Sequence, residues 1–287
     1  PLAYLPTSAS YVYQGQLHTA LHWLQRAIVS QPSNLELGGW ILYLNDCLEN
    51  YETAHEWSNW LDQGVTKQAQ PLALQARHHF LTGNFQLAIQ IANRVLKLGL
   101  PDRWGSDAII MRIKRDEALA NGDPEAGLEV FRQHRPELFQ ARPDLTAENV
   151  QQAVDLAQLL QLAGQPDQSD RLLDAALDYY QQPWSTAGPN RAWLLPVKAE
   201  ALAIRGDNEA ALAELQRIIE LGWRINWRWE TELNFNFNGI RRTAEFFTMV
   251  EYLTRDMETQ RDQVYQLAAE GKILPPPAWQ NPVLFSQ

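Results

Sequence analysis

A glycine followed five positions later by an alanine recurs along this chain at regular intervals. The pattern opens residues 15–20 and 83–88, whose glycines stand 68 residues apart, which is twice 34. Halfway between them, residues 49–54 keep the alanine at the same offset but lack the glycine. A fixed period of this length indicates a repeat architecture, in which each unit buries its apolar face against its neighbours.

Three further turn glycines follow at wider spacing, with Gly127, Ser169 and Ala211 five positions after them. Gly122, Gly164 and Gly206 stand 39, 42 and 42 residues after the preceding turn glycine. Apolar and small residues follow each glycine in steps of three and four, which is typical of one buried helix face. We therefore expect about six helix hairpins, with longer loops between the later units.

The first unit carries the clearest signature. The residues at its key positions are Tyr4, Tyr11, Gly15, Ala20, Leu24, Ala27 and Pro32. Their spacing resembles that of the tetratricopeptide repeat family, whose unit is a hairpin of 34 residues. The resemblance implies an all-α fold, a right-handed superhelical solenoid of about six hairpins. Pro6 departs from the pattern, because proline inside a helix breaks or delays it.

The same reasoning divides the chain into three parts. Residues 1–221 form the repeat array, and residues 222–271 form an aromatic-rich helical cap with a long helix over 243–270. A solenoid needs such a cap, since its last hairpin otherwise exposes an apolar edge. We assign the aromatic cluster of this part, Trp223, Trp227, Trp229, Phe235 and Phe237, to that closure. Residues 272–287 include three consecutive prolines and are expected to form an extended tail.

The cap carries a second, narrower resemblance. Its residues are Gly222, Trp223, Arg224, Arg241, Arg242, Phe246, Phe247, Asp256, Met257, Gln260 and Arg261. They resemble the end of tetratricopeptide regions in bacterial signalling proteins, in which a class III nucleotide cyclase or a winged-helix regulator precedes the array. The resemblance implies a sensory or scaffolding role. Because the chain begins inside a repeat-like unit at Pro1, we expect further sequence upstream.

Composition narrows the class of partner. The 24 Lys and Arg residues are outnumbered by 34 Asp and Glu residues, which gives a net charge of −10 and no basic stripe for nucleic acid. The single cysteine, Cys47, excludes an intramolecular disulfide and leaves the compartment, cytoplasmic or periplasmic, open. No apolar run is long enough for a membrane span. We expect a protein or peptide partner.

The first helix of every hairpin is the expected wall of a concave groove. Counting along these helices gives five candidate groove residues: Tyr43, Arg77, Arg112, Gln158 and Trp193. An extended peptide can lie on such a wall, with side chains in aromatic pockets and carboxylates held by arginine. The competing interpretation is that these residues are ordinary packing contacts. The recurring Lys and Asn of the family's clamp for acidic peptide ends are missing.

The sequence contains no sign of catalysis, a metal or a cofactor. It lacks the glycine-rich, serine and HExxH signatures of the common enzyme classes. His18 and His22 share a helix face but have no third ligand, so we expect no metal site. Glu230 and Glu232 are neighbouring acids of a kind that an acidic chain contains by chance.

Two other functions stay open. One is a self-association module, a homodimer through the exposed edge of the first unit. The other is an α/α-toroid carbohydrate-active enzyme, which is also helical, acidic and rich in tryptophan. That enzyme requires two facing carboxylates in a deep cleft, about 5 to 10 Å apart.

Overall fold

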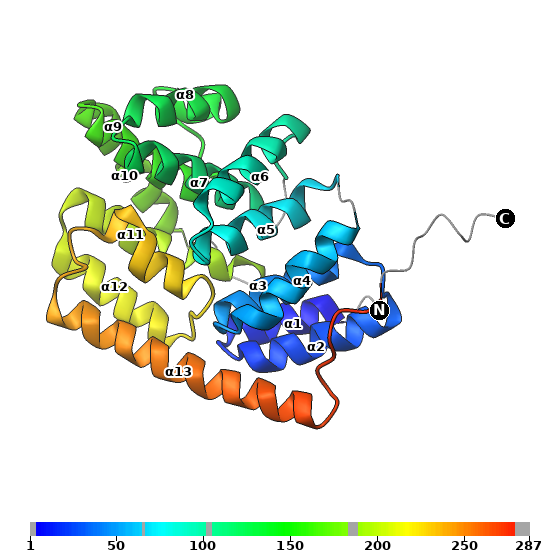
Figure 1. The fold of residues 1–287 in the computed structure, drawn as a ribbon. Helices are drawn as coiled ribbons and strands as arrows, with labels where there is room; N and C mark the ends of the chain where they lie inside the picture. Colours follow the sequence, from blue (N-terminus) through cyan, green and yellow to red (C-terminus); the bar gives the residue numbers. More distant parts are fainter. Residues whose placement is uncertain (1–3, 65–66, 102–104, 183–188, 279–287) are drawn as a thin grey trace.

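The computed structural model describes residues 4–64, 67–101, 105–182 and 189–278. Within these ranges the chain is helical and contains no β-strand (Figure 1). The prediction of an all-α fold is confirmed.

The helices pair into six hairpins in chain order. They are α1 (Tyr4–Tyr13) with α2 (Leu17–Ser30), α3 (Leu35–Cys47) with α4 (Tyr51–Gln63), α5 (Ala69–Leu81) with α6 (Phe85–Leu98), α7 (Ser106–Ala120) with α8 (Pro124–His134), α9 (Val150–Leu162) with α10 (Pro166–Tyr180), and α11 (Val197–Arg205) with α12 (Asn208–Glu220). Short 3-10 helices, η1 (Pro136–Phe139) and η2 (Pro189–Leu194), precede α9 and α11. From α3 onward, each first helix also packs against the first helix of the next hairpin.

The repeat pattern has a direct structural cause. The turn glycines Gly83 and Gly164 have φ values of 80° and 76°, a left-handed conformation that other residues adopt at a cost. Ala20 and Ala88 lie five positions after a turn glycine, and Ala54 holds the equivalent position in the second hairpin. All three are completely buried between helices. Small side chains at these positions let the helices approach closely, as the sequence predicted.

The two ends of the array meet. Helix α1 of the first hairpin packs against η2, which leads into the last hairpin. The backbones of Gly15 and Gly222 also touch, since a Cβ atom on Gly15 would lie 2.5 Å from the Gly222 carbonyl oxygen. Both glycines have positive φ values, 76° and 99°. The six hairpins therefore follow a closed path, which Figure 1 shows from blue through green to yellow.

Helix α13 (Ala244–Ala269) completes this closure. Thr243 caps it by accepting a hydrogen bond from the Phe246 amide at 3.3 Å, close to the predicted start. The sequence predicted that this helix covers the edge of the last hairpin; it packs against α12 and also against α2 of the first hairpin. Gln260 fastens it there, because its side chain accepts from the Leu17 amide and donates to the Gly15 carbonyl, both at 2.7 Å.

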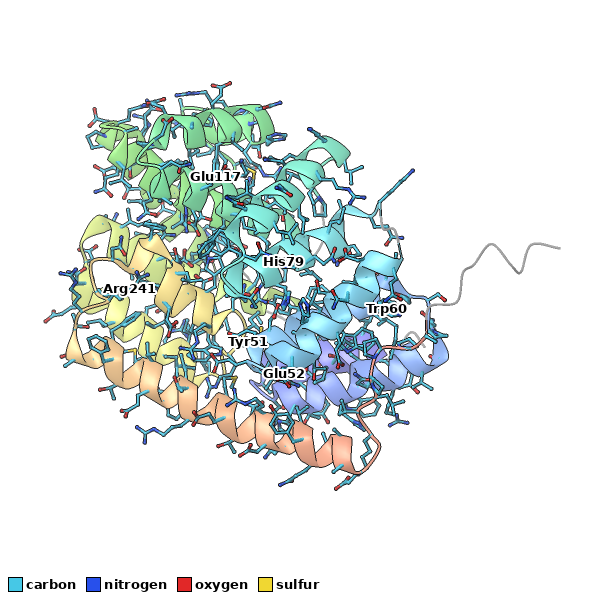
Figure 2. All side chains as sticks on the ribbon, viewed as in Figure 1. Tyr51, Glu52, Trp60, His79, Glu117 and Arg241 are labelled. Atoms are coloured by element: carbon cyan, nitrogen blue, oxygen red, sulfur yellow. The ribbon has the colours of Figure 1, made fainter. Side chains whose placement is uncertain are left out.

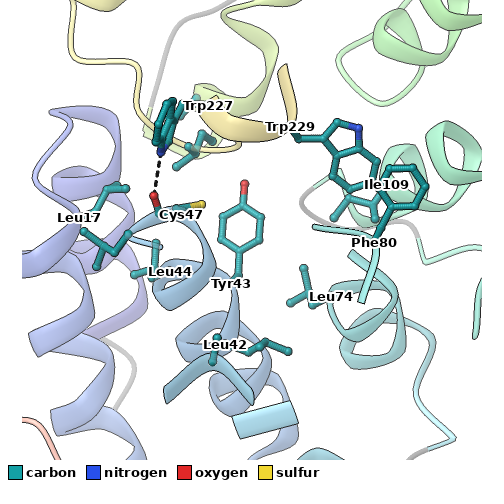
Figure 3. Packing of buried hydrophobic residues seen from close by; sticks show 14 of the residues in the cluster. Leu17, Leu42, Tyr43, Leu44, Cys47, Leu74, Phe80, Ile109, Trp227 and Trp229 are labelled. Atoms are coloured by element: carbon teal, nitrogen blue, oxygen red, sulfur yellow. Dashed lines mark hydrogen bonds between the residues drawn. The ribbon is translucent and has the colours of Figure 1, made fainter. Parts of the chain in front are cut away.

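The aromatic cluster, which we assigned to the cap, touches the cap helix at one point and otherwise lies inside the array. Phe237 packs beside Phe246 of α13, with ring centroids 6.1 Å apart. Residues 223–237 lie along the inner helices, and they include one turn of π-helix, η3 (Trp229–Leu233), and a short 3-10 helix, η4 (Phe235–Phe237). Trp227 donates to the Cys47 carbonyl at 3.0 Å, and Trp229 stacks on Phe80 with ring centroids 4.8 Å apart (Figure 3). We call residues 223–237 the inner segment. Side chains crowd the space enclosed by the hairpins (Figure 2).

The start of the tail docks on the first hairpin. Ile273 is buried against the apolar core, and the Leu274 amide donates to the Gln25 side chain at 3.3 Å. The predicted extended tail runs on past this contact, and its end, from residue 279 onward, lies outside the described residues.

Candidate functional site

The five predicted groove residues come from five successive inner elements. Tyr43, Arg77, Arg112 and Gln158 lie on α3, α5, α7 and α9, and Trp193 lies on η2. The first four are between 1% and 8% exposed, and Trp193 is half-buried. The inner segment contacts all four of these helices and occupies the inner face where we expected a peptide.

Arg77 belongs to a small cluster, the Arg77 cluster, with Asp46, His78 and Asn226. Its guanidinium donates to Asp46 at 3.0 Å and to the Asn226 side chain at 2.7 Å, and it lies 4.4 Å above the Tyr43 ring. The second oxygen of Asp46 lies 2.7 Å from the His78 ring. One arginine and one aspartate therefore join α3, α5 and the inner segment.

Arg112 lies at the centre of a second cluster and contacts three acids. It donates to Glu230 at 2.6 Å, to Glu200 at 2.7 Å and to Asp155 at 3.0 and 3.1 Å. These acids come from the inner segment, α11 and α9 respectively. All four side chains are almost completely shielded from solvent.

Arg115 extends this second cluster by one turn of α7. It pairs with Asp155 and Asp116, and it donates to the side chains of Asn234 and Asn236, both at 3.1 Å. We call the set that contains Arg112, Arg115, Asp116, Asp155, Glu200 and Glu230 the Arg112 cluster. It ties the inner segment to α7, α9 and α11.

Negative charge is in excess in the Arg112 cluster. Four carboxyl groups share two paired guanidinium groups, and the half-buried Arg241 at its edge donates to the Asn234 backbone carbonyl. At least one carboxyl group therefore lacks a compensating charge. Burial raises the pKa of Glu230 to about 8, against the attraction of Arg112, and burial also raises the pKa of Asp116. One Glu200 oxygen has no hydrogen-bond partner.

Two adjoining pockets remain beside these clusters. The apolar pocket has a volume of about 80 Å³ and lies between α1, α2, α3 and η2, where Ala9, Val12, Leu24 and Ala192 contribute to its wall. The polar pocket has about 20 Å³, and its wall includes Arg112, Gln151, Asn226, Trp229 and Glu230. Trp40, Tyr43 and Trp193 line both pockets. Figure 3 shows the Tyr43 hydroxyl pointing toward the inner segment.

This arrangement brings three of the five predicted residues together. Tyr43, Arg112 and Trp193 border the polar pocket, whereas Arg77 and Gln158 line neither pocket. In the sequence Glu230 looks like an acid of chance occurrence, yet its carboxylate accepts hydrogen bonds from Arg112 and Asn234. Glu232, two positions later, is exposed and pairs with Arg228. An Asn-Phe-Asn run in an aromatic segment is the only local sign of this polar contact.

Few groups in the described part of the chain suit covalent or metal chemistry. The Cys47 thiol is buried, and burial raises its pKa, so the unreactive thiol form is favoured. No group of three or more metal-ligating side chains occurs among the residues that the structure describes. His18 instead contacts Gln260. None of the described helices is long and apolar enough to span a membrane.

Comparison with known proteins does not add a family. No protein-family model matches the chain, and the curated proteins include no significant match to it.

Proposed function

We propose that this chain is a non-catalytic protein- or peptide-binding module, the scaffold or sensory part of a larger bacterial signalling protein. Its hairpins would form a right-handed tetratricopeptide-like solenoid whose ends are joined. The residues of the first unit and of the cap that resemble tetratricopeptide regions support this proposal. Because the inner segment covers much of the groove wall, binding is restricted to the part that stays open.

The observation that carries the proposal is the position of the two pockets. Of the five residues that sequence analysis selected for binding, three line the polar pocket. The adjoining apolar pocket can accept one side chain of a partner, and full burial of such a side chain contributes about 1.5 to 3 kcal/mol. An aromatic and aliphatic pocket with a few polar groups is typical of a specific binding site.

The apolar pocket also lies where the first and last hairpins of the array meet. The apolar pocket is lined by Leu5 and Val12 of α1 and by Ala192 and Trp193 of η2, elements more than 170 residues apart. A partner bound there contacts both ends of the array at once. This location suits a sensory module, because the occupant stabilises the closed ring over any open form.

The test is selection from a random peptide library displayed on phage, with the purified chain as target. The comparison variant is Ala9→Trp, which fills the apolar pocket from its rim; Ala213→Trp, at an exposed position of α12, is the control. We expect the unaltered chain and the control to enrich peptides that share one apolar anchor, and Ala9→Trp to lose them. Equal binding of the selected peptides to Ala9→Trp, or no enrichment at all, would contradict the proposal.

A further inference from the structure

We propose, on the basis of the proposed binding function, that the anchor accepted by this site is a positively charged amine on an apolar stem. The stem occupies the apolar pocket, and the ammonium group enters the polar pocket beside Glu230. A lysine side chain and a free alkylamine share this chemistry.

The shape of the site fits such a group. The large pocket is almost entirely apolar, and the small one sets polar side chains, Glu230 among them, in an otherwise apolar wall. Three aromatic side chains, Trp40, Tyr43 and Trp193, line both. A polar site of about 20 Å³ exceeds the 10 to 15 Å³ of probe space that one water molecule needs, so an ammonium group fits. The site therefore selects a ligand with a bulky apolar part and a small polar end.

The charge of the site favours a cation over an anion. Arg112 is the only basic residue among the described residues that line the polar pocket, and its guanidinium is already occupied by Asp155, Glu200 and Glu230. An incoming carboxylate would add negative charge to a cluster that already has an excess of it. An incoming ammonium group would supply the positive charge that the Arg112 cluster lacks.

Aromatic walls add to this preference. Trp193 and Trp229 present indole rings to the polar pocket, and the faces of aromatic rings attract cations most strongly where water is excluded. The protein already uses the same interaction nearby, since Arg77 lies above the Tyr43 ring.

Binding of the amine is linked to loss of a proton. Burial keeps the pKa of Glu230 at about 8, and the groups around it act in opposite directions: Arg112 lowers that pKa, whereas Glu200 and Asp155 raise it. Arg115 and Asp116 lie behind Asp155, and Tyr43 lies across the pocket. An ammonium group favours the ionised Glu230. Below pH 8, binding therefore releases a proton, and the affinity rises with pH.

The experiment is calorimetric titration of the purified chain with four probes. Hexylammonium, 1-hexanol and hexanoate share one stem and differ in charge; Nα-acetyl-lysine N-methylamide represents a lysine side chain. We expect hexylammonium to bind about 10 to 100 times more tightly than 1-hexanol at pH 8, the range for a hydrogen bond to a charged group, and hexanoate to bind more weakly than both. Binding of the lysine compound as well assigns the site to lysine; its failure beside hexylammonium assigns a free amine.

The pH series tests the same inference without a mutation. Between pH 6 and pH 8 the dissociation constant of hexylammonium should fall by up to about tenfold per pH unit, while that of 1-hexanol stays constant. Glu230→Gln should abolish this dependence and the preference for the amine. Glu232→Gln, two positions away and exposed, should leave both unchanged.

Two results would overturn the inference. One is equal affinity for hexylammonium and 1-hexanol, which leaves the apolar anchor of the proposed function intact while removing the amine. The other is the absence of binding by any probe at millimolar concentration. Peptide selection judges the proposed function separately, because it asks only whether Ala9→Trp abolishes enrichment, whatever the charge of the selected side chain.

Discussion

The Arg77 cluster and the Arg112 cluster hold opposite ends of the same inner segment. In the first, one guanidinium faces one carboxylate, and the remaining donors go to neutral groups of Asn226 and Cys47. In the second, two paired guanidinium groups serve four carboxyl groups. Both clusters are buried, so neither owes its ratio of guanidinium to carboxyl groups to exposure to solvent.

The contrast separates structural anchoring from a site that is ready for a ligand. In the Arg77 cluster one arginine faces one aspartate, and Arg77 itself borders neither pocket. The Arg112 cluster has a surplus of negative charge and forms part of the polar pocket. A buried surplus of negative charge is compensated by protons or by a bound cation. The raised pKa of Glu230 favours a bound proton in the free protein.

The largest expected effect comes from removing the central arginine. Arg112→Met leaves three buried carboxyl groups facing one another, and we expect the free energy of unfolding to fall by about 3 to 5 kcal/mol. Urea denaturation followed by circular dichroism measures this loss. A variant that shows no folded baseline counts as a loss of at least this size.

Arg77→Met provides the matched comparison. Asp46 keeps its contact with His78 after the change, so we expect a smaller loss, about 3 kcal/mol or less. The contrast between the clusters would be contradicted if Arg77→Met proved more destabilising than Arg112→Met under the same conditions.

The next effect is a dependence of stability on pH. Because the pKa of Glu230 is raised to about 8 in the folded state, the folded protein holds a proton that the unfolded chain loses at its ordinary, lower pKa. The stability that this proton provides is complete at acidic pH and is lost as the pH rises from about 5 to 8, by up to about 1.4 kcal/mol per pH unit.

Glu230→Gln should flatten that profile. Its free energy of unfolding, measured by urea denaturation at pH 5, 6, 7 and 8, is expected to vary less than that of the unaltered chain. Glu232→Gln should keep the original slope, since Glu232 is exposed. Parallel profiles for all three proteins would show that Glu230 is not the responsible group.

The smallest expected effect distinguishes two tryptophans of the inner segment. Trp227 donates its indole N–H to the Cys47 carbonyl, whereas the buried indole N–H of Trp229 has no hydrogen-bond partner. We expect Trp227→Phe to cost about 1 kcal/mol more in unfolding free energy than Trp229→Phe, after a similar loss of apolar contact. Equal losses would indicate that Trp227 does not donate this hydrogen bond to the Cys47 carbonyl of α3.

The hairpins were predictable because their packing is local. The glycine and alanine pattern reports contacts within one hairpin and with the next, and the predicted long helix over 243–270 corresponds to α13 at Ala244–Ala269. Pro6 did not break α1, which begins at Tyr4, because a proline in the first turn has no intrahelical hydrogen bond to lose.

The closure of the array and the course of the inner segment were not predicted, because both depend on contacts between residues that are far apart in the sequence. Leu17 and Gln260 are 243 residues apart, and Arg112 and Glu230 are 118 apart, so no local period reports them. One available sign was the composition of the inner helices. Every residue of α9 from Val150 to Leu160 is buried, and a helix that is covered on all sides has a neighbour on its inner face.

The candidate site was predictable in part for the same reason. Counting along the first helices selected Tyr43 and Arg112 together, and both line the polar pocket, because helix geometry determines which residues share a face. It could not identify Glu230 as their neighbour. That contact depends on where the chain travels after the last hairpin.

Hydrogen–deuterium exchange of residues 223–237 tests the central claim, that the chain fills its own inner face, most directly. The Trp223 amide donates to the Ile218 carbonyl, and the Asn234 amide donates to the Trp229 carbonyl. The segment also contacts the buried sides of α3, α5 and α9. The account predicts protection as strong as that of the buried helix α5. Exchange as fast as in the exposed bend at residues 141–142 would contradict it.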